Sequence, residues 1–297
     1  FWNSIRKKRM REPLFRRIGI PGFSRSIHLK YFTKFPNVGD QFSATLASMV
    51  FKNEIIPCNE LPIESKNLIL VGSILQWADS NSVVCGAGFI RSEVKVQAKP
   101  KRIICVRGPL SAGKLRQEGI ECPERYADPG VLAPALFPQK VVVRHPIGFV
   151  PHYWDMVHPF TEYCREHGVK ILNVRDEPEV FFHQLAECEV ILSTSLHGLI
   201  FAHAYGKPAL WLEISDKVIG GGFKFFDYYA SLGVAEGRVN RQIIPPDHFP
   251  DLLRLAEMAT PGNQQNLVSN MQESLHLAKH EFGSHWLSGL KRFYRTL

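Results

Sequence analysis

The chain of 297 residues lacks the sequence signatures of several common classes of protein. Its six cysteines include no CxxC pair and match no zinc-ligand spacing, so a structural zinc site is not expected. No apolar run reaches about 18 residues, the length at which a segment becomes a candidate membrane span. No signal-peptide pattern is present. We therefore expect a cytoplasmic protein whose thiols are free.

The signatures of nucleotide binding are also absent. The run Cys85-Gly86-Ala87-Gly88 follows a strand-like segment, but it lacks the third glycine of the dinucleotide fingerprint. The chain has no P-loop and no DxD-like pair of metal ligands. We therefore expect neither a metal ion nor a cofactor.

Positive charge is concentrated at the N-terminus. Residues 1–30 hold nine Lys or Arg residues and one Glu, which accounts for the whole formal net charge of +8. Trp2, Ile5 and Phe15 lie among them, and basic residues interleaved with hydrophobic ones suit an anionic membrane surface. Nucleic acid, or a solvated arm without a partner, are the alternatives. We favour the membrane and expect no nucleic acid.

The rest of the chain alternates between short apolar runs and helix-length amphipathic stretches. Strands are predicted over residues 28–32, 67–72, 82–86, 102–107, 147–151, 170–174, 190–193 and 209–214, with helices over 41–51, 108–118, 159–167, 177–188 and 196–205. Strands that alternate with helices predict parallel sheets with helices on both faces.

The pattern breaks at residues 137–140, which suggests a domain boundary. We predict a basic arm over 1–27, Rossmann-like domains over 28–139 and 140–249, and C-terminal helices over 250–297. The helices end in a basic amphipathic stretch, residues 286–295. Ligands of open parallel sheets bind beyond the carboxyl ends of the strands. The polar motifs at the predicted strand-to-helix turns are therefore the candidate site.

The first motif is Ser193-Thr194-Ser195-Leu196-His197-Gly198. The first turn of the helix that follows offers unpaired N–H groups and a positive dipole end, which together favour an anion. The hydroxyls have the simpler alternative of capping the helix. The helix dipole disfavours the protonated form of His197, which suits a neutral imidazole that acts as a base or a hydrogen-bond donor.

Three further motifs lie at similar turns. Arg107, in Val106-Arg107-Gly108-Pro109, offers a planar fork for phosphate or carboxylate, and a surface salt bridge is the alternative. Asp40, in the Asn37–Asp40 motif, either caps a helix or acts as a base toward a sugar hydroxyl. The motif Asp128-Pro129-Gly130 is typical of a helix entry.

The last motif is the aromatic block of residues 223–229. Lys224 and Asp227 lie three residues apart within it, flanked by aromatic rings. This spacing suits a face that stacks on a sugar, and equally a surface ion pair on an aromatic-rich helix.

Together, these motifs and their order resemble the polysaccharide pyruvyltransferase family, most closely the exopolysaccharide ketal pyruvyltransferases of the xanthan type. The motifs are NxGD, Val-Gly-Ser, CGAGF, VRGP, ADPG, VPHYWD, SLHG with AYGKP, and the Lys224/Asp227 block, across residues 30–235. The resemblance implies an α/β protein with two Rossmann-like domains in a GT-B-like arrangement around a central cleft. It implies phosphoenolpyruvate as donor and a terminal sugar of an exopolysaccharide or a lipid-linked oligosaccharide as acceptor.

The resemblance also implies roles for particular residues. It ties His197 and Arg107 to donor binding and catalysis. From the chemistry, we further hypothesise that Asp40 is the base toward the acceptor and that His152 of VPHYWD is a second acid/base. The predicted donor-binding residues are Arg107, Ser193, Ser195, Leu196, His197, Gly198 and Lys224, and the predicted acceptor-binding residues are Asn37, Asp40, Trp154 and Asp227. Many relatives carry an arginine where this chain has Ser195. The donor's charge would then be met by Lys224, by Arg144 or by the helix N-terminus.

Two other functions fit the same sequence less well. One is a GT-B glycosyltransferase that uses a nucleotide sugar, although no nucleotide signature is present. The other is a non-catalytic sugar-binding subunit at the membrane surface, which would not need His197 and Arg107 close together. We expect a cytoplasmic enzyme held peripherally at the inner face of the membrane.

The membrane role of the basic arm can be tested by deletion. Removing residues 1–27 should lower co-sedimentation with anionic liposomes, because most of the net positive charge is lost with them. Activity on a short soluble acceptor should survive. Liposomes without anionic lipid serve as the control, and unchanged co-sedimentation of the shortened chain contradicts the anchoring role.

Overall fold

The computed structural model describes residues 26–246 and 248–282. The chain has an α/β fold with two five-stranded sheets, and every pairing between neighbouring strands is parallel. Apart from its last two residues, the predicted basic arm lies outside the described residues, as does the stretch 286–295. Within the described part of the chain, no helix is both long enough and apolar enough to cross a membrane.

The two sheets are formed by successive parts of the sequence. The first has the order β2-β1-β3-β4-β5 and the second the order β10-β9-β8-β6-β7. The first sheet contains β1 (Ile27–Lys30), β2 (Ile55–Cys58), β3 (Asn67–Ile69), β4 (Ser82–Cys85) and β5 (Arg102–Cys105). The second contains β6 (His145–Val150), β7 (Lys170–Ile171), β8 (Cys188–Ser193), β9 (Ala209–Glu213) and β10 (Arg241–Ile243).

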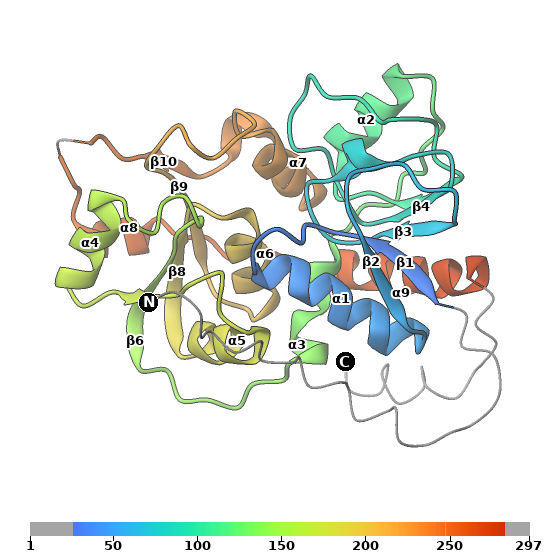
Figure 1. The fold of residues 1–297 in the computed structure, drawn as a ribbon. Helices are drawn as coiled ribbons and strands as arrows, with labels where there is room; N and C mark the ends of the chain where they lie inside the picture. The colour runs from blue at the N-terminus through green and yellow to red at the C-terminus, as the bar shows by residue number, and fades with distance from the viewer. Residues whose placement is uncertain (1–25, 247, 283–297) are drawn as a thin grey trace, which may run out of the picture.

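Helices cover both faces of each sheet, and several lie between the sheets (Figure 1). The α-helices are α1 (Val38–Phe51), α2 (Pro109–Gln117), α3 (Ala133–Leu136), α4 (Pro159–Glu166), α5 (Pro178–Ala186), α6 (Leu196–Ala204), α7 (Phe223–Ser231), α8 (Leu252–Glu257) and α9 (Gln265–Glu281). Short 3-10 helices span Leu75–Trp77, Pro129–Leu132 and Glu236–Arg238.

One hydrophobic core joins the two sheets. It contains buried residues of β1, β3 and β4 together with residues of β8, β9, α6 and α9. Phe42 of α1 lies near its middle, with its ring centroid 5.5 Å from that of Phe201 and 6.2 Å from that of Phe182. Two smaller hydrophobic cores lie on the other faces of the sheets. One is between the first sheet and α2, and the other is between the second sheet and helices α4 and α8. The two halves are therefore packed together across shared apolar side chains.

Most of the predicted elements are confirmed within a few residues, and all six cysteines are free as predicted. The prediction missed the edge strands β2 and β10. The predicted end of the arm at residue 27 falls inside β1. Helix α9 follows the second sheet in sequence but packs on β4 and β5 of the first. Figure 1 shows it beside the first sheet.

Candidate active site

The loop between β8 and α6 carries the first predicted motif. Ser193 is fully buried, and its Oγ accepts the N–H of Ser195 at 3.0 Å and lies 2.9 Å from the carbonyl oxygen of Val150. Ser193 therefore braces the loop and is not open to a ligand. Ser195 occupies the N-cap position of α6, but its side chain makes no capping bond. The alternative that a hydroxyl caps the helix is thus not realised, because the N-cap side chain of α6 forms no capping hydrogen bond.

His197 is the centre of the site. Its imidazole stacks on Phe201, with ring centroids 5.6 Å apart and planes at 22°. A Cβ atom at Gly39 would lie 2.4 Å from Nδ1, so only glycine lets α1 approach the ring this closely. On the other edge of the ring, Nε2 lies 4.0 Å from Oδ2 of Asp128. Burial lowers the pKa of His197 to about 3, helped by the positive charges of Arg107 and Lys224.

The sequence left open whether Asp40 caps a helix or acts as a base, and the structure gives the capping role to Asn37. Asn37 caps α1, because its Oδ1 accepts the N–H of Gly39 at 2.9 Å. Asp40 is not the cap. Its Oδ1 accepts the N–H of Phe32 at 3.2 Å, and burial raises the pKa of the carboxyl to about 7. Asp40 is therefore poised to exchange a proton near neutral pH.

Arg107 does not project into an open site as the sequence predicted. Its side chain is fully buried, and its Nη2 forms an ion pair with Oδ2 of Asp227 at 2.9 Å. Nε also donates to Asp227, Nη1 to Ser73 Oγ, and Nη2 to the carbonyl oxygen of Phe89. The guanidinium fork is occupied by protein groups. The predicted clamp on a ligand is wrong for this geometry, and Arg107 acts on the site through its charge.

Asp227 is likewise unavailable to an acceptor. It is fully buried, and it accepts the backbone N–H of Ser111 at 2.9 Å and the Ser111 hydroxyl at 2.6 Å, in addition to the bonds from Arg107. The prediction that Asp227 binds the acceptor is therefore wrong. It is also not the surface partner of Lys224, because it pairs with a different cation.

Lys224 is left without a carboxylate. Its side chain is 8% exposed, and no described acidic residue forms an ion pair with it. Nζ lies 5.4 Å from the centroid of the Phe225 ring. Burial lowers the pKa of Lys224 to about 8, with a further decrease from Arg107 and an opposing effect of Asp155. At neutral pH this is a nearly buried cation that favours an anionic ligand.

The loop after β6 holds His152 against the β8 loop. The N–H of His152 donates to Thr194 Oγ1 at 2.7 Å, and this hydroxyl donates to Oδ2 of Asp155 at 2.7 Å. The other oxygen of Asp155 accepts the hydroxyl of Ser215 at 2.6 Å. Burial lowers the pKa of His152 to about 3, with a contribution from Lys224, so this imidazole is neutral as well.

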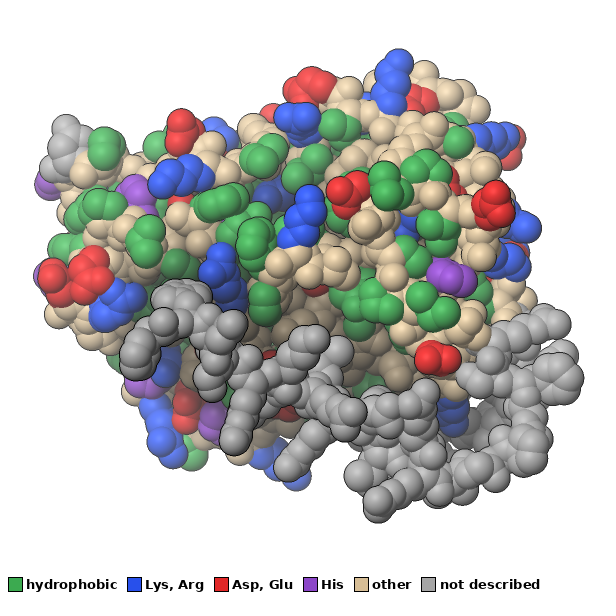
Figure 2. Space-filling view, in the orientation of Figure 1, with side chains coloured by type: hydrophobic (Ala, Val, Ile, Leu, Met, Phe, Trp, Pro, Cys, Tyr) green, Lys and Arg blue, Asp and Glu red, His purple; other side chains and the backbone are tan. Residues whose placement is uncertain are grey.

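Trp154, predicted from the sequence to bind the acceptor, belongs to an aromatic surface beside these groups whose other members the sequence did not indicate. Trp154 is 47% exposed, and its ring centroid is 5.0 Å from that of Tyr153, which lies 6.4 Å from Phe35. The guanidinium of Arg175 lies 5.7 Å from the rings of both Phe35 and Tyr153. The surface joins the loop after β1 to the loop after β6, near Asp40. Exposed hydrophobic and basic side chains also gather between the two sheets in Figure 2.

Three other residues complete the comparison with the sequence. Asp128 and Asp155 are fully buried beside the predicted residues, and neither was predicted as a site residue. The ADPG spacing alone indicated a helix entry, and Asp155 closes the VPHYWD motif, of which only His152 and Trp154 were given roles. Arg144 is wrong as an anion site, because it precedes β6 at the opposite end of the sheet and its exposed side chain pairs with Glu187 at 3.3 Å.

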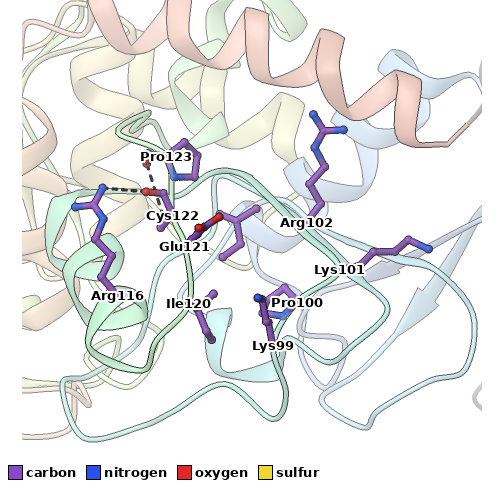
Figure 3. A pocket seen from close by; sticks show the side chains of 10 residues that line it. Lys99, Pro100, Lys101, Arg102, Arg116, Ile120, Glu121, Cys122 and Pro123 are labelled. Carbon is purple, nitrogen blue, oxygen red and sulfur yellow. Dashed lines mark hydrogen bonds between the residues drawn. The ribbon is translucent and has the colours of Figure 1, made fainter.

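A separate hollow of about 690 Å³ lies at the amino end of β5, away from this site (Figure 3). Two of its cations are already paired with protein groups. Arg102 forms an ion pair with Glu281, and Arg116 donates to the carbonyl oxygen of Cys122. Over residues 26–246 and 248–282, no group of three or more His, Cys, Asp or Glu residues is placed to hold a metal ion.

Comparisons with known proteins found one family model and two relatives. A family model described as polysaccharide pyruvyl transferase matches residues 15–216. The chain is 26% identical over 261 residues to the uncharacterized protein L143 of Acanthamoeba polyphaga mimivirus, covering 84% of this chain and 90% of that protein. It is 29% identical over 176 residues to the succinoglycan biosynthesis protein ExoV of Rhizobium meliloti (strain 1021), covering 56% of this chain and 54% of that protein.

A solved structure of the functionally uncharacterized protein KP1_0663 from Klebsiella pneumoniae subsp. pneumoniae NTUH-K2044 is also similar. It aligns with a TM-score of 0.40 and 14% sequence identity, over 75% of this chain and 94% of that one.

The structural role of Arg107 predicts a large loss of stability when it is removed. Arg107→Ala should lower the free energy of unfolding by about 3–5 kcal/mol, because the buried Asp227 loses its counter-ion. Arg144→Ala is the matched control, since its side chain is 70% exposed and such a pair contributes less than about 1 kcal/mol. Urea unfolding followed by tryptophan fluorescence measures both. Equal small losses in the two variants would contradict the assignment.

Proposed function

Because the chain belongs to the polysaccharide pyruvyl transferase family and is therefore a pyruvyltransferase, we propose that phosphoenolpyruvate is its donor and a terminal sugar its acceptor. The sugar would belong to an exopolysaccharide or a lipid-linked oligosaccharide. The product would be a pyruvate ketal that bridges two hydroxyls, with release of phosphate. The GT-B-like pairing of two Rossmann-like domains is part of the same proposal, supported by the two parallel sheets.

One observation carries the donor assignment. A nearly buried Lys224 without a carboxylate partner, the side-chain-uncapped N-terminus of α6 and the neutral His197 act on the same small region. A helix N-terminus and an unpaired ammonium both attract anions, and the low polarity of the surroundings strengthens each attraction. Phosphoenolpyruvate carries two anionic groups on three carbons. A compact site with several sources of positive potential suits it.

The chemistry requires two proton transfers in opposite directions. An acceptor hydroxyl adds to the central carbon of the donor and loses its proton, while the methylene carbon gains one. A second hydroxyl then forms the second C–O bond as the C–O bond to phosphate breaks, and its proton leaves with the general base. The sugar thus gains one pyruvic acid less one water, and phosphate is the leaving group.

The described residues suit these two transfers. His197 would deliver the proton to the methylene carbon, because the charge of bound donor raises the pKa of a nearby imidazole from its low value in the free enzyme. Asp40, with a pKa of about 7, would accept the proton of the acceptor hydroxyl. His152 lies near Lys224 and is a second candidate for the acid/base on the donor side.

The aromatic surface of Phe35, Tyr153 and Trp154 supports a carbohydrate acceptor. Aromatic rings present broad apolar faces, and the apolar face of a sugar ring stacks on them without loss of its hydroxyl hydrogen bonds. The surface begins beside Asp40, the proposed base for the acceptor. We also propose that the enzyme works peripherally at the inner face of the membrane, where the N-terminal arm would contact anionic lipid.

The function is tested by incubating the enzyme with phosphoenolpyruvate and a panel of exopolysaccharide oligosaccharides. Mass spectrometry should detect an acceptor that has gained pyruvic acid less water, with phosphate released in equal amount. Phosphoenolpyruvate should protect the protein against heat, and UDP or GDP should not. Protection by a nucleotide without any pyruvate adduct would favour the glycosyltransferase instead.

His197→Ala should abolish turnover. Phosphate release from phosphoenolpyruvate should fall by at least about 100-fold, because the proposed proton donor to the methylene carbon is removed. Ser48→Ala is the control, because Ser48 is exposed on α1 away from the site, and this variant should release phosphate at the wild-type rate. Near-normal release by His197→Ala would remove this residue from the mechanism.

Lys224 predicts a distinctive pH dependence. Its pKa of about 8 means that the ammonium is charged below this pH and neutral above it. The value of kcat/KM for phosphoenolpyruvate should therefore decrease as the pH rises through about 8, because the free enzyme loses its attraction for the anion. Lys224→Arg keeps its charge over this range and should lose the decrease. The same alkaline decrease in both proteins would exclude Lys224 as its source.

A further inference from the structure

Two buried polar atoms without partners face each other in the site. Nε2 of His197 and Oδ2 of Asp128 are both inaccessible to solvent and form no hydrogen bond, and they lie 4.0 Å apart. Leaving a buried donor or acceptor unpaired costs about 1–3 kcal/mol, and such atoms are rare in folded proteins. Two of them opposite each other indicate a bond that forms in another state of the enzyme.

Neighbouring residues restrain both the Asp128 carboxyl and the His197 imidazole. Oδ1 of Asp128 accepts the N–H of Gly130 at 2.9 Å, which fixes the carboxyl plane at the start of the 3-10 helix. The imidazole is held by Phe201 on one face and bounded by Gly39 at Nδ1. The only approach that these restraints leave is a shift of about 1 Å between Nε2 and Oδ2, which brings them to normal hydrogen-bonding distance.

The charges of the two groups decide which one donates. Burial raises the pKa of Asp128 to about 6, although the Gly130 N–H and the charge of Arg107 lower it, so the group is mainly a carboxylate at neutral pH. His197 is neutral in the free enzyme. A carboxylate only accepts hydrogen bonds, so it requires the proton of the neutral imidazole to be on Nε2. The tautomer with a free Nδ1 is therefore the one that Asp128 selects.

We propose, building on the proposed function, that Asp128 is a positioning residue that accepts a hydrogen bond from Nε2–H of His197 when donor binds and so reserves Nδ1 for proton transfer. Catalytic hydrogen bonds are commonly long in the free enzyme and shorten in the complex. The 16% of the His197 side chain that is exposed does not lie at Nε2, which is buried. Nδ1 takes up a proton from solvent when the donor is bound and releases it to the methylene carbon, while Asp128 stabilises the imidazolium in between.

The tautomer of the wild-type protein is the first test. Histidine labelled with ¹⁵N reports by NMR which ring nitrogen carries the proton, and the loss of one signal in His197→Gln assigns the resonance. At neutral pH, His197 should be the Nε2–H form. An Nδ1–H form would overturn the proposal without any variant of Asp128.

Asp128→Asn is the second test. The asparagine Oδ1 can still accept the Gly130 N–H, but its amide donates toward Nε2 and selects the opposite tautomer. We expect kcat to fall by at least about 100-fold with KM for phosphoenolpyruvate nearly unchanged, and the His197 signal to move to the Nδ1–H form. A kcat within a few-fold of wild type, or an unchanged tautomer, contradicts the role.

Asp251→Asn is the matched control. Asp251 caps α8 in the same way, with its Oδ1 accepting the N–H of Leu253 at 2.8 Å, and its carboxyl lies outside the described site. This variant should keep wild-type kcat and the wild-type tautomer. The two proposals fail separately: a wild-type enzyme that makes no pyruvate adduct refutes the function, whereas the tautomer measurement judges Asp128 in either case.

Discussion

The buried ion pair between Arg107 and Asp227 determines the arrangement of the site. It joins the end of β5 in the first sheet to α7 in the second half of the chain, with both side chains fully buried. Asp227 also accepts two hydrogen bonds from Ser111 in the first turn of α2. An internal carboxylate thus occupies the anion-attracting N-terminus of α2. At the corresponding end of α6, Ser195 makes no capping bond and no carboxylate of the described residues accepts from the first turn, which supports the proposed anion site there.

The same ion pair explains the charge state of the remaining groups. Because Asp227 is bound to Arg107, Lys224 one turn earlier on α7 lacks a carboxylate partner. Its charge then acts on His197 and His152, and together with burial it keeps both imidazoles neutral. The ammonium beside two neutral imidazoles gives this region a positive charge, which supports the proposal that its ligand is an anion. The charge of the site therefore depends on Asp227 pairing with Arg107 and not with Lys224.

The sequence predicted the elements and the place of the site better than the roles of its charged residues. Alternating apolar and amphipathic segments specify strands and helices locally, and the carboxyl ends of parallel strands must meet at one edge. The edge strands β2 and β10 are short and half-exposed, and β2 contains Pro57, so no apolar run marked them. The partners of Arg107 and Asp128 are far away in sequence, and no local pattern reveals a pairing across 120 residues.

Glycines at two motif positions provide the space that the His197 and Arg107 side chains need. Gly39 and Gly88 lie where a Cβ atom would come within 2.4 Å of the His197 imidazole and of the Arg107 guanidinium, respectively. Their motifs, NxGD and CGAGF, come from the first half of the chain and make room for side chains that the site requires. Because one hydrophobic core joins both sheets, separating the halves to admit a ligand would expose apolar surface at about 25 cal/mol per Å². The close fit at these glycines is thus held by packing, and it places His197 before any substrate arrives.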